Sequence, residues 1–285
     1  MQTKLQPIPA ANPVILSVRN LSLHYFQKTV FERRIPVTAL TNVSLDLQRG
    51  KTLALVGPSG CGKSSLARCL VLLERPSFGE ILYAGQNLLE LKSKELKEVR
   101  RDIHLIFQDS ASALNPGMTI EEVLLEPLEI HEPTLAKKDR FLRLVSACEQ
   151  AALSSKWLTR RPSELSGGQR QRVAIARSLI SRPKILILDE ALSALDLSTQ
   201  SQIANLLLDL QREHALTYLF ITHDMRLARM LAHDVAAMKG GRILDSSPSS
   251  LLTPDIHANP ASIGSISTAK DTETIRLQEI PSVNE

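Results

Sequence analysis

The residues with the clearest chemistry form a glycine-rich stretch, Gly57-Pro58-Ser59-Gly60-Cys61-Gly62-Lys63-Ser64. It fits the pattern Gly-x-x-x-x-Gly-Lys-Ser/Thr, in which backbone N–H groups turn inward and form a nest for phosphate oxygens. The apolar run 53–56 before it predicts a strand, and the helical pattern over 63–73 places a positive helix end at the same point. We therefore predict a phosphate-binding loop in which Lys63 reaches the β- and γ-phosphates and Ser64 is a Mg²⁺ ligand.

An acidic pair supplies the second half of such a site. The apolar run 185–188 predicts a buried strand that ends directly at Asp189 and Glu190. Phosphate-loop enzymes hold their metal with an acid at a strand end, so Asp189 is the predicted metal ligand. Glu190 can polarise a water that attacks the γ-phosphate. An acidic pair alone more often only solvates a strand end, so this interpretation depends on the loop upstream.

A third pattern is the stretch Leu165-Ser166-Gly167-Gly168-Gln169. Ser166 with Gln169 three residues later is a capping box, which predicts that a helix begins there. In a chain that also has a phosphate loop, this stretch resembles the LSGGQ signature of ABC ATPases. The resemblance covers about residues 14–245 and implies an α/β fold, that of a P-loop ABC ATPase with a RecA-like core, an antiparallel β subdomain and a helical subdomain.

The resemblance also implies roles for residues outside these three motifs. Gln108 resembles the Q-loop glutamine that approaches the metal and the water, and Ser193-Ala194-Leu195-Asp196 resembles the D-loop. His223 resembles the switch histidine that bonds the γ-phosphate. Tyr25 is the best candidate for the aromatic residue that stacks on adenine, with Phe26 and Phe31 as competitors.

The resemblance implies that two cassettes face each other head to tail around ATP and Mg²⁺. Ser166, Gly167 and Gly168 of one cassette would touch the γ-phosphate held by the other. The predicted catalytic residues are Gln108, Glu190 and His223, and the predicted metal ligands are Ser64, Gln108 and Asp189. The predicted nucleotide-binding residues are Tyr25, Gly57, Pro58, Ser59, Gly60, Cys61, Gly62, Lys63, Ser64, Ser65, Ser166, Gly167, Gly168 and Gln169.

The elements that position these residues follow from hydrophobic periodicity. Alternating apolar residues before the phosphate loop predict half-buried strands, interrupted by a polar excursion at 27–36. Further strands are predicted at 103–107 and 218–221, and a hairpin at 235–244. Residues 109–164 are helical in composition and broken by prolines, namely Pro116, Pro127, Pro133 and Pro162.

This pattern divides the chain into one cassette with two short flanking segments. We expect an ABC ATPase domain at 14–245, containing a helical subdomain at about 109–180. Residues 1–13 form an N-terminal extension, and 246–285 form a loosely packed C-terminal tail rich in Ser, Thr and Pro.

Composition excludes several classes of protein. The 285 residues are 43% apolar and 22% charged, which is ordinary for a globular protein and excludes wholesale disorder and fibrous repeats. A net charge of +4 without a dense basic run does not suggest nucleic-acid binding. No apolar stretch approaches the roughly 18 residues of a membrane span, and no secretory signal is expected.

The transported cargo is suggested only by resemblance. Ile106-Phe107-Gln108-Asp109, followed by Leu114-Asn115-Pro116, resembles the importer subunits of the peptide and nickel group. Ala191 after the acidic pair, and the stretch 219–224, resemble the nickel type. The expected cargo is therefore nickel or a related metal complex, and a dipeptide or oligopeptide is the alternative.

The resemblance also implies partners and location. It implies a second, non-identical ABC ATPase subunit, two transmembrane permease subunits and an extracytoplasmic substrate-binding protein, with no nucleic acid. The chain would attach through these partners to the cytoplasmic face of the inner membrane. The rival interpretations are a soluble non-transport ABC ATPase, a small-molecule kinase with a phosphate loop, and an exporter.

Overall fold

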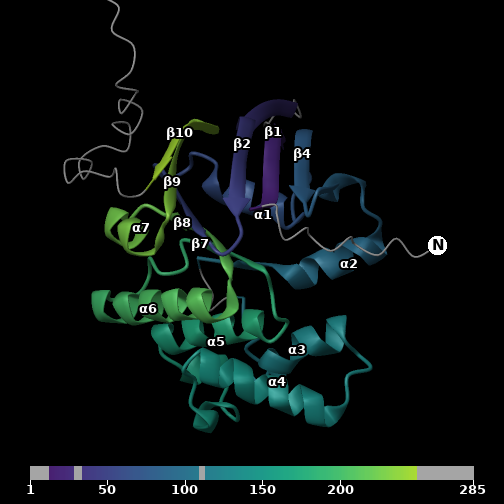
Figure 1. Ribbon diagram of the computed structural model, residues 1–285, viewed down its shortest axis with the longest axis vertical. Coiled ribbons are helices and arrows are strands. Elements are labelled where there is room, and N and C mark those ends of the chain that lie inside the picture. The colour runs from purple at the N-terminus through teal and green to yellow at the C-terminus, as the bar shows by residue number, and fades with distance from the viewer. Residues whose placement is uncertain (1–12, 29–33, 109–112, 249–285) are drawn as a thin grey trace, which may run out of the picture.

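Two β-sheets of different kinds organise the protein (Figure 1). The computed structural model describes residues 13–28, 34–108 and 113–248. A six-stranded sheet has the order β10-β9-β3-β8-β7-β6, and all its neighbouring pairs are parallel except β9 with β10. Its strands are β3 (Thr52–Val56), β6 (Ile103–Ile106), β7 (Ile185–Asp189), β8 (Thr217–Thr222), β9 (Asp234–Lys239) and β10 (Arg242–Pro248).

The second sheet is antiparallel and has the order β2-β1-β4-β5. Its strands are β1 (Val14–Lys28), β2 (Arg34–Gln48), β4 (Phe78–Tyr83) and β5 (Gln86–Asn87). Figure 1 shows β1, β2 and β4 at one end of the molecule, and the helices α3, α4 and α5 at the opposite end.

Helices cover both faces of the parallel sheet, and their N-termini place several of the predicted site residues. The α-helices are α1 (Lys63–Leu70), α2 (Ser93–Asp102), α3 (Ile120–His131), α4 (Lys137–Gln150), α5 (Gly167–Leu179), α6 (Leu197–His214) and α7 (Met225–Leu231). Short 3₁₀ turns occur at Leu88–Glu90, Ser155–Trp157 and Pro162–Glu164.

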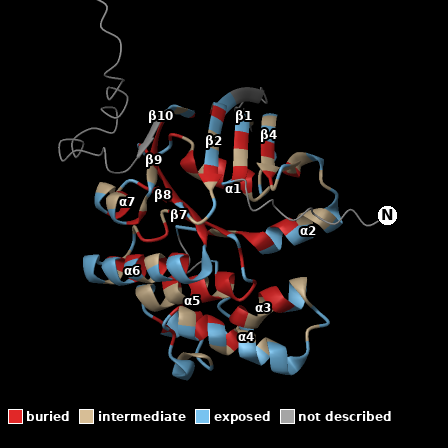
Figure 2. Ribbon diagram, viewed as in Figure 1, coloured by how far each residue is buried: buried red, intermediate tan, exposed pale blue. Residues whose placement is uncertain are grey.

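Each central strand divides its side chains between two apolar cores, because successive residues of a strand point to opposite faces. Leu53 and Leu55 of β3 pack with α1 and the antiparallel sheet, whereas Ala54 and Val56 pack with the helices of the other face. Burial on both faces explains why these strands are continuous apolar runs. Figure 2 shows the central strands almost entirely buried, while outward parts of α4 and α6 are exposed.

The helical block 109–164 differs from its prediction at one proline. Pro127 lies inside α3 and does not end it, whereas Pro133 follows the end of that helix. Pro127 is buried together with Val123 and Leu124, so packing offsets the lost backbone hydrogen bond. Helix α2 and strands β4 and β5 were not predicted, because their segments contain many charged or turn residues.

Several predicted boundaries also shift by a few residues. The polar excursion at 27–36 is shorter than predicted, because β1 continues to Lys28 and β2 begins at Arg34. The helix predicted over 63–73 ends at Leu70, and the strand predicted over 103–107 ends at Ile106.

The predicted hairpin at 235–244 is present, and its second strand extends beyond the predicted start of the tail. Ser246, Ser247 and Pro248 pair with β9, so residues 246–248 belong to the sheet. Residues 1–12 of the predicted N-terminal extension and 249–285 of the predicted tail lie outside the described part of the chain. Among the described helices, none has both the length and the apolar character that a membrane span requires.

Candidate nucleotide site

The phosphate loop connects the end of β3 to the start of α1, as the sequence predicts. Its glycines are required by close backbone contacts. A Cβ at Gly57 would lie 2.2 Å from the carbonyl oxygen of Met238, and a Cβ at Gly62 would lie 2.6 Å from that of Ala39. Gly62 also has φ +108°, a left-handed conformation that glycine adopts without strain. Strands β9 and β2 therefore fix the loop from behind.

Lys63 is buried within this loop, with only 5% of its side chain exposed. Its Nζ donates hydrogen bonds to the carbonyl oxygens of Gly57 at 2.9 Å and Pro58 at 3.1 Å. The same atom lies 3.8 Å from Oε1 of Glu190. The ammonium group thus lies between the loop backbone and the acidic pair, where a phosphate would meet it.

Ser64 and Asp189 bring two oxygen donors together at the end of the loop. The Ser64 hydroxyl donates to Oδ1 of Asp189 at 3.1 Å. Burial raises the pKa of Asp189, and the nearby Glu190 carboxylate acts in the same direction, while the Ser64 hydrogen bond opposes them. A cation would relieve this unfavourable burial of charge. Hydroxyl and carboxylate oxygens are the donors that Mg²⁺ prefers, so these residues fit that ion.

Glu190 is the point at which three strand ends meet. Its carboxylate Oε2 accepts a hydrogen bond from Nε2 of Gln108 at 3.3 Å and lies 3.4 Å from Nδ1 of His223. Gln108 follows β6, Glu190 follows β7 and His223 follows β8, and these three strands are neighbours in the parallel sheet. The carboxyl ends of parallel strands form the crevice where ligands bind in open α/β sheets. The structure therefore brings all three predicted catalytic residues together.

The backbone of Glu190 has a rare conformation that no sequence pattern predicts. Glu190 has φ +48°, in the left-handed region that few non-glycine residues adopt. Two contacts hold this conformation. The Glu190 N–H donates to the carbonyl oxygen of Ile221 at 3.0 Å, and the Ser193 hydroxyl donates to the carbonyl oxygen of Glu190 at 2.8 Å. Ser193 thus belongs to the site through the backbone of Glu190.

The hydroxyl group of Tyr25 lies near the start of α1. That hydroxyl is hydrogen-bonded to Oε2 of Glu74 and lies 3.3 Å from Oγ of Ser65. Glu74 was not predicted, because it follows α1 in an ordinary turn and belongs to no motif. The competing candidate Phe31 and the side chain of Phe26 lie outside the described residues.

The signature stretch forms the predicted helix start. Ser166 caps α5, because its N–H donates to Oε1 of Gln169 at 2.9 Å and its Oγ accepts from the Gln169 N–H at 3.4 Å. Ser166 and Gly167 are exposed. Gly168 packs against the first turn of α6, where a Cβ would lie 2.5 Å from Cγ2 of Thr199. The signature helix is thus braced by the helix that follows the D-loop stretch.

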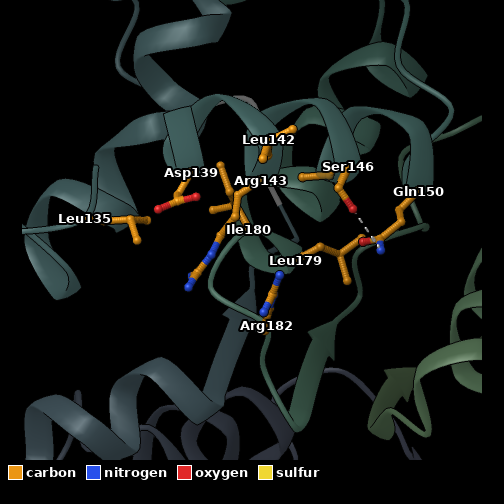
Figure 3. A pocket seen from close by; sticks show the side chains of 10 residues that line it. Leu135, Asp139, Leu142, Arg143, Ser146, Gln150, Leu179, Ile180 and Arg182 are labelled. Atoms are coloured by element: carbon orange, nitrogen blue, oxygen red, sulfur yellow. Dashed lines mark hydrogen bonds between the residues drawn. The ribbon is translucent and has the colours of Figure 1, made fainter. Parts of the chain in front are cut away.

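A separate cavity of about 310 Å³ lies among the helices (Figure 3). Figure 3 shows Asp139, Leu142 and Arg143 of α4 on one side and Leu179, Ile180 and Arg182 on the other. None of the residues that line it belongs to the predicted nucleotide site. This cavity is therefore distinct from the site formed by the loop and the strand ends.

A glycine loop between a parallel strand and a helix, with a buried lysine and an acidic pair two strands away, defines a phosphate-loop nucleotide-binding protein. Comparison with known proteins defines the family. Residues 40–193 match the family described as "ABC transporter". A solved dimeric ATP-binding cassette in a post-hydrolysis state, bound to ADP and Pi, is similar with a TM-score of 0.73 and 30% identity, over 82% of this chain and 98% of that one.

Curated relatives extend the similarity across nearly the whole chain. A probable peptide ABC transporter ATP-binding protein of Sinorhizobium fredii is 39% identical, over 94% of this chain and 78% of its own length. A nickel import ATP-binding protein of Escherichia coli O157:H7 is 44% identical, over 81% of this chain and 86% of its own length. The chain therefore belongs to the ABC transporter family, as an ATP-binding, ATP-hydrolysing importer subunit. The predicted fold class and ATPase activity are confirmed.

Proposed function

We propose that this chain supplies the energy for import by hydrolysing ATP between its phosphate loop and the signature helix of a second cassette. The observation that carries the proposal is the convergence on Glu190 of Lys63, Gln108 and His223, which come from three other segments of the chain. A merely structural acidic residue at a strand end has no need of three polar partners that all face a phosphate cradle.

The proposed role of Glu190 is to polarise the attacking water. Oε1 of its carboxylate faces the Lys63 ammonium, and Oε2 faces Gln108 and His223. Of the Glu190 side chain, 15% is exposed. His223 is 58% exposed, so its ring can turn from Glu190 to the γ-phosphate. Gln108 links the same carboxylate to the segment that leads into the helical subdomain.

Ser64 and Asp189 would hold Mg²⁺, with Gln108 as a further ligand. When bound, this ion supplies positive charge beside the β- and γ-phosphate oxygens. The chain's own residues provide the rest of the charge pattern: Lys63 at the phosphates, and the N–H groups at the start of α1 beneath them. Pro58, Ser59, Gly60, Cys61 and Ser65 complete the proposed cradle.

The second half of the site would come from another cassette. Ser166 and Gly167 are exposed at the N-terminus of α5, where backbone N–H groups favour an anion. We propose that Ser166, Gly167, Gly168 and Gln169 close over the ATP of a second, non-identical ABC ATPase subunit. The proposed ATPase domain of this chain is 14–245, and strand pairing extends it to residue 248. Its proposed helical subdomain is at about 109–180.

The remaining partners follow from the importer class. We propose two transmembrane permease subunits and an extracytoplasmic substrate-binding protein, with this chain held peripherally at the cytoplasmic face of the inner membrane. Nickel or a related metal complex is the proposed cargo, supported by the 44% identity to the nickel import protein. A peptide cargo is the second candidate, supported by the relative named for peptides, which matches 94% of the chain.

The central experiment is Glu190→Gln in the purified transporter. We expect ATP binding to persist while turnover falls by about 100-fold or more, because general-base catalysis is lost and the shape of the side chain is kept. Glu213→Gln on α6, an exposed glutamate whose side chain is 69% accessible, is the matched control and should leave turnover unchanged. Near-normal ATPase activity of Glu190→Gln would refute the proposed role.

Cargo requires a separate measurement. Cells that lack the chain would be complemented with the native chain or with Glu190→Gln, and uptake of radioactive Ni²⁺ and of a labelled dipeptide would be compared. We expect only the native chain to restore uptake, and Ni²⁺ to be the restored cargo. Restored dipeptide uptake with unchanged Ni²⁺ uptake would replace nickel by peptide and leave the ATPase proposal intact.

A further inference from the structure

The side chain of Tyr25 is held by a network that none of the sequence motifs contains. Tyr25 is partly buried and packs against the apolar core that contains Leu21 and Leu23, and its hydroxyl group reaches Ser65 of α1. Its hydroxyl group donates to Oε2 of Glu74 and lies 3.3 Å from Oγ of Ser65. The ring is therefore fixed at its far end as well as at its Cα.

Glu74 is itself held in place by two hydrogen bonds with Arg68. Its Oε1 accepts from Nη1 of Arg68 at 3.3 Å, and its backbone N–H donates to the carbonyl oxygen of Arg68 at 3.3 Å. Only 23% of the Glu74 side chain is exposed. One oxygen thus faces the cation on α1 and the other faces Tyr25, so the carboxylate has a defined orientation.

This network ends at the phosphate loop. Ser65, the second contact of the Tyr25 hydroxyl, directly follows Ser64, whose hydroxyl bonds Asp189. Tyr25, Glu74 and the start of α1 therefore form one unit, which sets the distance between the aromatic ring and the cradle. Burial raises the pKa of the Tyr25 hydroxyl, and the Glu74 hydrogen bond acts in the same direction, so the hydroxyl remains a donor at neutral pH.

We propose that Glu74 is a positioning residue that presents the Tyr25 ring to the nucleotide base. The inference rests on the proposed function and on the predicted role of Tyr25 as the aromatic residue that stacks on adenine. An aromatic side chain that is already ordered loses less conformational entropy when a base stacks on it. A hydrogen bond from a phenol to a charged carboxylate is among the stronger side-chain interactions, so it can select one ring orientation.

The experiment compares two ligands, because a base contact and a phosphate contact respond differently. The full chain is titrated with ATP in the presence of EDTA and, separately, with inorganic tripolyphosphate, which has no base. We expect Glu74→Ala to weaken ATP binding about fivefold and to leave tripolyphosphate binding within about twofold of native, since base stacking contributes about fivefold or more per base.

Three further variants isolate the hydrogen bond. Tyr25→Phe should weaken ATP binding as Glu74→Ala does, and the double variant should be no weaker than either single one. Glu74→Gln keeps an acceptor oxygen and should recover most of the affinity. Glu80→Ala, at an exposed glutamate of β4, is the matched control and should bind both ligands normally. Tyr25→Phe and Glu74→Gln also provide the test if Glu74→Ala does not fold.

The outcomes separate this inference from the proposed function. If Tyr25→Ala weakens ATP binding and Glu74→Ala does not, Glu74 is not the positioning residue, and the base contact stands. If Tyr25→Ala leaves ATP binding unchanged, the base contact itself is wrong and the inference falls with it. If Glu74→Ala weakens ATP and tripolyphosphate equally, Glu74 supports α1 as a whole, and the positioning role is refuted.

Discussion

The contact between the signature helix and the helix after the D-loop stretch gives a quantitative prediction. A Cβ at Gly168 would lie 2.5 Å from Cγ2 of Thr199, well inside van der Waals contact. Thr199 cannot rotate away at low cost, because its Oγ1 donates to Oδ2 of Asp196 at 2.7 Å. Breaking a hydrogen bond to a charged group costs about 1.5–3 kcal/mol. Gly168→Ala must therefore shift one helix against the other.

The expected magnitude is the balance of two opposing effects. Inserting a carbon atom into a packed contact costs about 1–3 kcal/mol. Replacing glycine by alanine in a helix returns up to about 1 kcal/mol. We therefore expect Gly168→Ala to lower the free energy of unfolding by about 1–2 kcal/mol.

The assay is urea unfolding of a double-mutant cycle. Thr199→Ser removes Cγ2 and keeps the hydroxyl that bonds Asp196, so Gly168→Ala should become neutral or slightly stabilising in that background. The coupling free energy between the two sites should be about 2 kcal/mol. Gly167→Ala is the matched control, because its Cβ would lie 3.5 Å from Cδ2 of Leu195, an ordinary contact.

One result would refute this reasoning. If Gly168→Ala destabilises the native chain and the Thr199→Ser chain equally, with a coupling below about 0.5 kcal/mol, the contact with Thr199 is not the cause. The same variants also predict an effect on ATPase activity. If the shift moves the start of α5, ATPase activity of the assembled transporter should fall with Gly168→Ala and recover with the added Thr199→Ser.

Two other predictions concern charge. Lys63→Ala should weaken ATP binding about tenfold or more in a nucleotide titration, because an ammonium that now lies at the loop carbonyls is lost; unchanged affinity would contradict the predicted role. Burial, aided by the charge of His131, lowers the pKa of His104 to about 4 from 6.5. Since the unfolded chain then binds a proton that the folded chain does not, stability should fall as pH drops from 6.5 toward 4. The loss between pH 7.5 and 5.5 is about 1 kcal/mol, and His104→Gln should reduce it; equal pH dependence in both chains would count against this pKa.

Local motifs are the features of this chain that can be predicted most directly from its sequence. The phosphate loop, the capping box at Ser166 and the acid at the end of β7 each depend on a few neighbouring residues, and the structure has all three in their predicted elements. Pro127 shows the limit of such rules. Taken alone it predicts a break, yet burial among apolar neighbours keeps α3 continuous.

The phosphate-binding residues are predictable from the sequence, because loop geometry and helix capping depend on adjacent residues. Which distant residues meet becomes known only from the folded chain. The parallel order β8-β7-β6 brings His223 and Gln108 to Glu190, and the turn after α1 brings Glu74 to Tyr25. Such pairs depend on strand order and on packing between sheets, which are set by the burial of the whole apolar core and leave no mark on the spacing of the residues themselves.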